Sequence, residues 1–236
     1  MVKVILWDID GTLLNFEMSE KYAIRKCFSI FELGECTDEM LAQYSQINRK
    51  YWEGLERGEL TKQEVLVGRF KEFFDKQGLP TEKAEAFNSE YQIRLGDKAF
   101  YNDEGGQIVE QLKKKGIKQY AVTNGTLTAQ ERKLKLSGLD QQGLDQLLDG
   151  VFISDVIGVE KPNIGFFDAV WKEIGSYKKN EVVIVGDSLT SDMQGGNNAG
   201  VLCCWYNPQK YANDKGLRID YEIQDLREVP RLFLSK

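Results

Sequence analysis

Two aspartates separated by a single residue, in the segment Asp8-Ile9-Asp10-Gly11-Thr12, are the side chains of this chain best suited to catalysis. The apolar run before them, residues 4–7, predicts a buried strand, and Gly11 allows a sharp turn. Because an unpaired carboxylate is costly to bury, packing alone rarely places such a pair at a strand end. One carboxylate could act as nucleophile and the other as general acid and base, with a metal ion neutralising them. The alternative is an ordinary Asp-rich turn after an edge strand.

Further polar residues follow the other predicted strands. In a parallel sheet the carboxyl ends of all strands open on one side, so side chains placed there can converge. Three groups of residues have this position: Thr123-Asn124-Gly125 after the strand ending at Val122, Gly186-Asp187-Ser188 with Asp192 one turn later, and Lys161-Pro162 in a loop ahead of a helix.

The types of these residues fit the handling of a phosphoryl group. Thr123 and the amides after it can donate hydrogen bonds to phosphoryl oxygens, and Lys161 supplies a point charge. Four carboxylates would gather with them, and two carboxylates about 4 Å apart repel by ~4 kcal/mol at an effective dielectric near 20. Such a cluster needs a cation, and oxygen ligands without His or Cys select Mg²⁺. Taken singly, each segment could also be a plain turn, a helix N-cap or a surface loop.

The elements that must position these side chains predict an α/β fold: a Rossmann-like parallel sheet with an inserted all-helical domain. Strand and helix signals alternate along the second part of the chain, with strands over 117–123, 151–154, 182–186 and 201–206 and helices over 107–115, 129–137, 164–174 and 191–199. Residues 16–95 carry no strand signal, which indicates a helical domain 16–95 inserted into a core domain formed by 1–15 and 96–236.

Within the helical insert, cap residues indicate where helices begin. Asp38 is predicted as one N-cap, Thr61 and Glu64 as a capping box, and Thr81 as the cap of a helix from 82 towards 91. A short repeat, 138–141 and 143–146, is too small for a solenoid and indicates an irregular surface loop. Cys203 and Cys204 are adjacent in a predicted strand and should therefore point to opposite faces.

Composition excludes several classes of function. The chain has 236 residues, a formal net charge of -6, no histidine and four cysteines. The absence of histidine excludes Ser-His-Asp, Cys-His and His-ligated metal chemistry, and the net charge gives no reason to expect nucleic acid as a partner. No apolar run approaches a membrane-spanning length, and the first strand leaves no room for a signal peptide. We therefore expect a cytoplasmic protein with reduced cysteines.

The motifs together resemble the haloacid dehalogenase-like hydrolase superfamily. Asp8-x-Asp10-Gly11-Thr12 is similar to its first motif, Thr123 to its second, Lys161 to its third and Gly186-Asp187-x-x-x-x-Asp192 to its fourth. The insert after the first motif is similar to the C1-type cap of that superfamily. Four further segments resemble the noncanonical pyrimidine 5'-nucleotidase subfamily: 12–16, 55–59, 158–162 and 204–208. Two departures are Asn15, where Asp is more usual, and a loop over 138–150 that is longer than usual.

The resemblance implies a phosphomonoester hydrolase. Asp8 would attack phosphorus to form an aspartyl-phosphate, while Asp10 would protonate the leaving group and then activate water. It also implies that Thr123, Asn124 and Lys161 bind the phosphoryl group. Mg²⁺ would be held by Asp8, the main-chain carbonyl of Asp10, and Asp187, with Asp192 and Ser188 orienting ligands or waters. The cap would close to exclude water and to read the leaving group.

Several alternatives stay open at this point. Halide needs no proton to leave, so the presence of Asp10 argues against 2-haloacid dehalogenase activity. A phosphonate hydrolase would need a Schiff-base lysine in the insert, where none stands out. A small sugar-phosphate phosphatase, a sugar phosphomutase and a non-catalytic phosphate-binding protein remain.

The substrate is expected to be a small phosphorylated metabolite, with a nucleoside monophosphate favoured, but the sequence does not identify it or the oligomeric state. Tyr22, Trp52, Arg57 and Arg69 of the insert could meet a base or a sugar. Aromatic residues at helical spacing are more often core residues, and Arg57 is more often a solvated charge, so we do not assign them to the site.

Overall fold

The computed structural model describes residues 1–136 and 143–234. The chain divides into two compact units: a core unit of residues 1–16 and 99–236, and a helical unit of residues 17–98. The sequence pattern places the same two junctions at 15/16 and 95/96. No helix among the described residues is both long and apolar enough to span a membrane. All four cysteines are free thiols, and three of them are buried.

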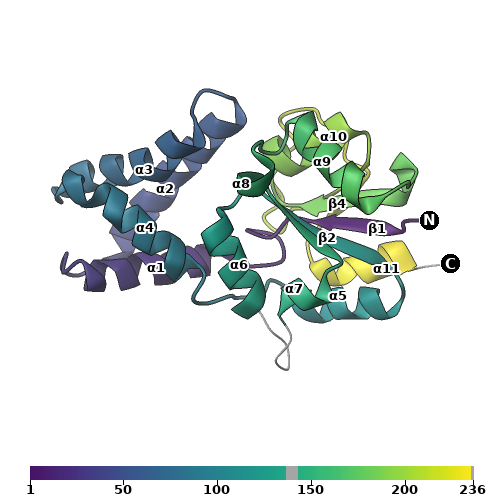
Figure 1. Cartoon of the computed structure of the whole chain (residues 1–236), viewed down its shortest axis with the longest axis horizontal. Helices are drawn as coiled ribbons and strands as arrows, with labels where there is room; N and C mark the ends of the chain where they lie inside the picture. The colour runs from purple at the N-terminus through teal and green to yellow at the C-terminus, as the bar shows by residue number, and fades with distance from the viewer. Residues whose placement is uncertain (137–142, 235–236) are drawn as a thin grey trace. The chain divides into compact units, whose positions relative to one another are not determined.

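The core unit is built on one six-stranded parallel sheet, in the order β3-β2-β1-β4-β5-β6 (Figure 1). The strands are β1 (Val4–Trp7), β2 (Lys118–Thr123), β3 (Gly150–Ile153), β4 (Val182–Gly186), β5 (Leu202–Tyr206) and β6 (Tyr221–Ile223). β1 lies in the middle of the sheet, and Trp7 at its end pairs with Ala121 of β2 and Val185 of β4. The predicted α/β class is confirmed, and Asp8 leaves the sheet between two neighbouring strand ends.

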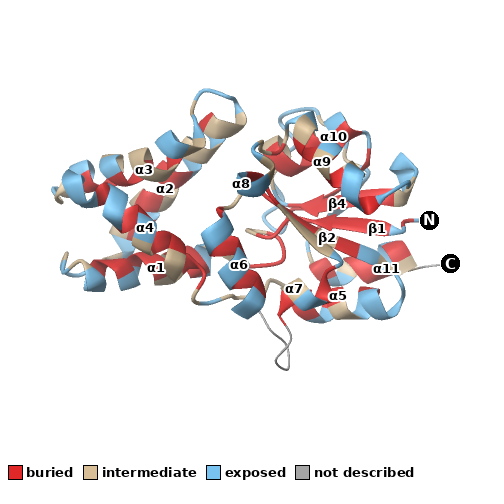
Figure 2. Cartoon of the chain, viewed as in Figure 1, coloured by how far each residue is buried: buried red, intermediate tan, exposed pale blue. Residues whose placement is uncertain are grey.

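Alternating side chains of the strands enter two separate apolar layers. Val4 and Leu6 of β1 pack into one layer, whereas Ile5 and Trp7 pack into the other, as the two-residue period of a strand requires. Cys203 and Cys204 divide in the same way, as predicted. The first layer is covered by α9 (Ile164–Ile174) and α10 (Gln194–Ala199), and the second by α5 (Gly105–Lys114) and α11 (Val229–Leu234) (Figures 1 and 2).

Some local elements differ from the prediction. The helix predicted over 191–199 begins as a π-helical turn, Leu189–Met193, and continues as α10. α6 (Leu127–Leu136) starts two residues early. β6 and α11 are unpredicted because they are short. The shorter elements are α7 (Leu144–Leu147), α8 (Ser154–Ile157) and the 3-10 turns Lys179–Glu181 and Leu226–Glu228.

The short repeat has two different outcomes. Its first copy, 138–141, lies outside the described residues. Its second copy, 143–146, contributes to the helical turn α7, and Leu144 is fully buried there. The prediction of an irregular surface loop is therefore wrong for the second copy. Leu144 and Leu147 pack into the same apolar layer as Ile5 and Trp7.

The helical unit consists of α1 (Phe16–Ile30, whose first residue belongs to the core unit), α2 (Asp38–Glu56), α3 (Lys62–Gln77), a 3-10 turn (Thr81–Lys83) and α4 (Ala84–Leu95). The capping box of Thr61 and Glu64 is confirmed. Asp38 is not an N-cap, because Thr37 takes that position and accepts a hydrogen bond from the Met40 amide at 3.3 Å. Thr81 does not cap α4 either, because the chain after Pro80 first makes the 3-10 turn.

An aromatic cluster forms the interior of the helical unit. Its ring centroids lie 4.9 to 6.2 Å apart. All of its members are buried: Phe28, Tyr44, Phe70, Phe73, Phe74, Phe87 and Tyr91. Offset and edge-to-face pairs of this kind contribute about 0.5–1.5 kcal/mol each beyond the area they bury, so the unit has a core of its own.

A charged pair linked by an amide lies beside this aromatic cluster. The Asn48 amide donates to the Glu20 carboxylate at 2.8 Å and its oxygen accepts from the Arg69 guanidinium at 2.7 Å. The Ser45 hydroxyl also donates to Glu20. Glu20 and Arg69 are each only 2% exposed. Burial, opposed by the hydrogen bond from Ser45 and by the charge of Arg69, raises the pKa of Glu20 to about 7.

We expect this carboxyl to make the protein less stable as the pH rises. The pKa of Glu20 is raised from 4.5 to about 7 in the folded chain, so the folded state holds the proton more tightly. The free energy of unfolding should therefore fall between about pH 4.5 and 7, by roughly 3 kcal/mol in total. Urea unfolding at pH 5 and pH 7.5 should show a smaller difference for Glu20→Gln than for the unsubstituted protein. The exposed Glu85→Gln is the control, and an equal pH response in all three proteins would contradict the prediction.

Candidate active site

The turn after β1 is fixed by contacts along its main chain. The Asp8 amide donates to the Val185 carbonyl at 2.9 Å, and the Asn102 amide side chain donates to the carbonyls of Gly11 and Thr12 at 3.2 and 2.9 Å. Gly11 has a φ of +95°, and a Cβ there would lie 2.6 Å from an oxygen of Asp187. Glycine is therefore required at this position for two reasons, the left-handed backbone and the close approach of the carboxylate.

Lys161 joins two of the carboxylates in the interior. Its Nζ donates to Asp8 Oδ1 at 2.8 Å, to Asp192 Oδ1 at 2.6 Å and to the Val122 carbonyl at 2.7 Å. Lys161 and Asp192 are each 1% exposed and Asp8 is 6% exposed. Burial alone would lower the pKa of Lys161, but the charges of Asp192 and Asp8 outweigh it and the pKa is raised. The ammonium therefore stays charged.

Asn124 holds the main chain of Lys161 in place. Its side-chain nitrogen donates to the Lys161 carbonyl at 2.9 Å, and its side-chain oxygen accepts from the Lys161 amide at 2.8 Å. Thr123 is buried, and its hydroxyl accepts from the Gly125 amide at 3.1 Å. The sequence predicted these two residues at the strand end, but it did not predict that the Asn124 side chain would position the lysine.

The segment after β4 brings the other two aspartates into the site. Ser188 caps the π-helical turn by accepting from the Ser191 amide at 3.1 Å, and its own amide donates to Asp192 Oδ2 at 3.1 Å. The Asp187 side chain is exposed; it accepts from the Thr12 hydroxyl at 3.2 Å. Both oxygens of Asp192 are thus engaged by protein donors, so Asp192 is suited to orient the site.

The carboxylates of Asp8, Asp187 and Asp192 are grouped closely enough to hold a metal ion, with one oxygen from each within 4.8 Å of the others. Asp8 Oδ2 is buried and has no hydrogen-bond partner among the described residues. Burial and the charge of Asp192, partly opposed by Lys161, raise the pKa of Asp8 above its usual range. Three closely grouped carboxylates, which supply only oxygen ligands and excess negative charge, fit Mg²⁺.

The Asp10 side chain has two buried hydrogen-bond donors of its own. Gln130 Nε2 donates to one of its oxygens at 2.6 Å, and Lys133 Nζ lies 2.5 Å from the other. Both donors come from α6 and are fully buried. The sequence gives no sign of this contact, because the same helix also carries the exposed Glu131, Arg132 and Lys135. Nothing in the pattern separates inward from outward polar residues there.

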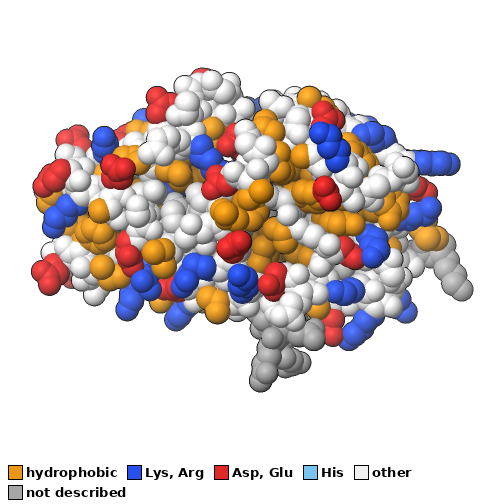
Figure 3. All heavy atoms as spheres, viewed as in Figure 1, with side chains coloured by type: hydrophobic (Ala, Val, Ile, Leu, Met, Phe, Trp, Pro, Cys, Tyr) orange, Lys and Arg blue, Asp and Glu red, His pale blue; other side chains and the backbone are white. Residues whose placement is uncertain are grey.

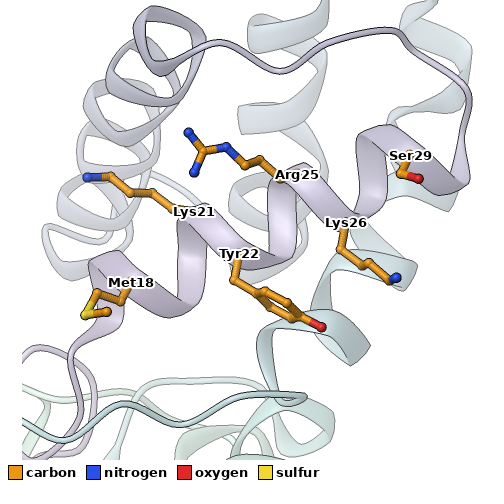
Figure 4. Close-up of a pocket in the computed structure, with 6 residues that line it drawn as sticks. All are labelled: Met18, Lys21, Tyr22, Arg25, Lys26 and Ser29. Atoms are coloured by element: carbon orange, nitrogen blue, oxygen red, sulfur yellow. The ribbon is translucent and has the colours of Figure 1, made fainter.

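The insert residues that could have met a base or sugar have local partners: Arg69 lies over the Trp52 ring at 5.9 Å, and Lys98 over the Tyr22 ring at 4.7 Å. Arg57 pairs with Glu59 at 2.8 Å on the surface, and Arg69 is buried in the helical unit. Tyr22 lines a shallow hollow on α1 with Lys21 and Arg25 (Figure 4). These two cations pair with Glu17 and Asp38, each at 2.5 Å. Two of the cations that line the hollow are therefore already paired.

The visible surface carries charges of both signs. Lys and Arg side chains alternate with Asp and Glu side chains over the face shown in Figure 3. The chain as a whole carries a net charge of -6. Charges of both signs are therefore mixed over the face shown, unlike a basic nucleic-acid-binding face.

Known proteins match this chain over the residues that form the site. A family model described as haloacid dehalogenase-like hydrolase matches residues 2–200. The pyrimidine 5'-nucleotidase PynA of Streptococcus pneumoniae is 31% identical, covering 96% of this chain and 93% of its own length. The pyrimidine 5'-nucleotidase YjjG of Escherichia coli is 28% identical, covering 97% and 96%.

A solved structure of another member of this family is also similar to the chain. A crystal structure of the HAD-hydrolase YfnB from Bacillus subtilis, bound to magnesium, matches with a TM-score of 0.89 and 30% identity over 98% of each chain. The model match extends from the first strand past Asp192, so it includes every strand end that carries a site residue. The chain belongs to the haloacid dehalogenase-like hydrolases, and it is an enzyme of the phosphatase type within that family.

Proposed function

We propose that this protein hydrolyses phosphate monoesters with Mg²⁺ and an aspartyl-phosphate intermediate, and that its substrates are pyrimidine nucleoside 5'-monophosphates. The observation that carries the proposal is the different hydrogen bonding of the two carboxylate oxygens of Asp8. One of its oxygens accepts from the buried Lys161 at 2.8 Å, and the other is buried without a partner. A carboxylate anchored through one oxygen, with its second oxygen unengaged at the end of a central strand, is suited to nucleophilic attack.

Two steps follow from this arrangement. Asp8 Oδ2 attacks phosphorus, a new bond forms between them, and the ester bond to the leaving oxygen breaks. Water then attacks the phosphorus of the aspartyl-phosphate, which releases phosphate and regenerates the Asp8 carboxylate. Lys161 and the hydroxyl of Thr123 stabilise charge on the phosphoryl oxygens, and Asn124 keeps Lys161 in place while contributing its amide.

Asp10 supplies the proton transfers for both steps. It gives its proton to the departing alkoxide and later takes one from the attacking water, which contributes typically ~10²–10⁴-fold. Asp8, Asp187 and the main-chain carbonyl of Asp10 would hold Mg²⁺, with Asp192 and Ser188 orienting the site. When bound, the metal ion offsets the negative charge of the carboxylates and of the phosphoryl oxygens.

The substrate class rests on the relatives. PynA and YjjG, both named as pyrimidine 5'-nucleotidases, match nearly the whole chain, including the helical unit. Phosphate release from a panel of nucleoside monophosphates and sugar phosphates, with and without Mg²⁺, tests the proposal. We expect turnover that requires the metal and is fastest with pyrimidine nucleotides. Turnover led by a sugar phosphate would overturn the substrate class, and transfer to a bisphosphate acceptor without free phosphate would indicate a mutase.

Replacing Asp10 should slow the hydrolysis of some substrates more than others, depending on how much protonation their leaving groups need. Asp10→Asn removes the proton donor, so we expect alkyl esters such as nucleoside monophosphates to slow by about 10²–10⁴-fold. p-Nitrophenyl phosphate should slow far less in its first step, because its leaving group needs little protonation. Single-turnover measurements of leaving-group release on both substrates make the comparison, and equal slowing of the two would show that Asp10 has only a structural role.

A further inference from the structure

Asp8 and Asp10 each form an ion pair with a different buried lysine. Asp8 pairs with Lys161 at 2.8 Å, whereas Asp10 pairs with Lys133 at 2.5 Å. Lys133 is fully buried, and a lysine is seldom buried completely unless its charge is paired. Nothing in the proposed chemical steps uses Lys133, so its place beside Asp10 calls for a separate explanation.

Gln130 completes the contact from the same face of α6, three residues before Lys133. Its Nε2 donates to Asp10 Oδ2 at 2.6 Å, so the two oxygens of Asp10 have one donor each. Gln130 is fully buried, and its Oε1 has no hydrogen-bond partner among the described residues. Leaving a buried acceptor unsatisfied costs about 1–3 kcal/mol, which argues against a role in stability alone.

The backbone nearby is adapted to this contact. A Cβ at Gly125 would lie 2.0 Å from Gln130 Nε2, so any larger residue there would displace the amide. Gly125 follows directly after Thr123 and Asn124, at the end of β2. α6 is also fixed at its start, where the Leu127 amide donates to Asp155 at 2.9 Å. The helix therefore links the placement of Asp10 to the strand end that binds phosphate.

We infer that Gln130 and Lys133 are positioning residues that hold the Asp10 carboxyl at the leaving group. The inference rests on the proposed function, because it assigns the two residues to the proton-transfer step. A displacement of about 1 Å in a reacting group can cost about 10²-fold in rate.

The test uses Lys133→Met and Gln130→Leu, with Lys135→Met as the matched control. Lys135 lies on the same helix but is exposed, so the control makes the same chemical change away from Asp10. We expect both site variants to lose about 10- to 100-fold in kcat on a nucleoside monophosphate. Single-turnover release of p-nitrophenol from p-nitrophenyl phosphate should change by less than about threefold, since that step needs little proton donation. The control should match the unsubstituted protein on both substrates.

A double-mutant cycle separates positioning from a general structural role. In an Asp10→Asn background, Gln130→Leu should cause no further loss on the nucleotide, because the residue it positions can no longer donate a proton. Equal losses on both substrates, full additivity with Asp10→Asn, or unchanged activity would each overturn the inference. Gln130→Leu keeps every charge, so it serves if Lys133→Met does not fold. An unsubstituted enzyme that hydrolyses neither substrate would instead overturn the proposed function.

Discussion

Asp8→Asn should abolish phosphate release while leaving the fold intact. The substitution is nearly isosteric, and the amide oxygen can still accept from Lys161 in place of the carboxylate. It removes the nucleophile, because an amide oxygen does not form a phosphoryl ester that water can hydrolyse. We expect kcat to fall by roughly 10⁴-fold or more, a loss of the size seen when nucleophiles are removed from other hydrolases.

The same variant should still bind Mg²⁺, but more weakly. Asp187 and the main chain at Asp10 keep their oxygens, whereas the Asp8 charge is gone. Calorimetric titration with Mg²⁺ and a phosphate-release assay measure the two properties separately. Asp149→Asn is the matched control, because Asp149 also pairs with a lysine, Lys118, at 2.7 Å. It precedes β3 and so lies at the amino end of that strand, whereas the site lies at the carboxyl ends of the strands. Substantial turnover by Asp8→Asn would exclude the covalent mechanism.

The parts of the site that sequence predicted are those fixed by strand ends. An apolar run followed by a polar residue marks where a buried strand ends. In a parallel sheet all strands end on the same side, so the position of the strand end places the polar residue on that side. Asp8, Thr123 and Asp187 all follow such runs. Lys161 does not directly follow a strand, so its place was less certain from the pattern; in the structure it is held by the long-range contact with Asn124.

Contacts made by helices were not predictable in the same way. Gln130 and Lys133 point inward from a helix whose other polar residues face solvent, and a 3.6-residue period predicts an apolar inner face. A buried ion pair breaks that rule, so the pattern assigns both residues to the surface. The start of α4 was missed for a related reason. Thr81 is a residue type that is common at helix N-caps. Here it opens a 3-10 turn instead, which depends on the backbone conformation after Pro80.

Lys161→Met should lower the free energy of unfolding by about 3–5 kcal/mol, because it leaves buried carboxylates without their cation. Methionine nearly matches the length of the lysine side chain, so little packing is lost. Lys161 Nζ is the shared donor to Asp8 and Asp192 at 2.8 and 2.6 Å. Those carboxylates would have to take up protons or admit water, and both processes cost free energy in the folded state.

The matched control is Lys118→Met, which breaks a lysine–aspartate pair of similar length at the surface. Lys118 pairs with Asp149 at 2.7 Å, but its side chain is 53% exposed, so the loss should stay below about 1 kcal/mol. Urea unfolding without metal compares the two variants. Adding Asp192→Asn to Lys161→Met should recover part of the loss, since it removes one of the unpaired charges. If the double variant were less stable than Lys161→Met, charge compensation would not be the reason for burying this lysine, and its hydrogen bond to Val122 would have to carry the structural role instead.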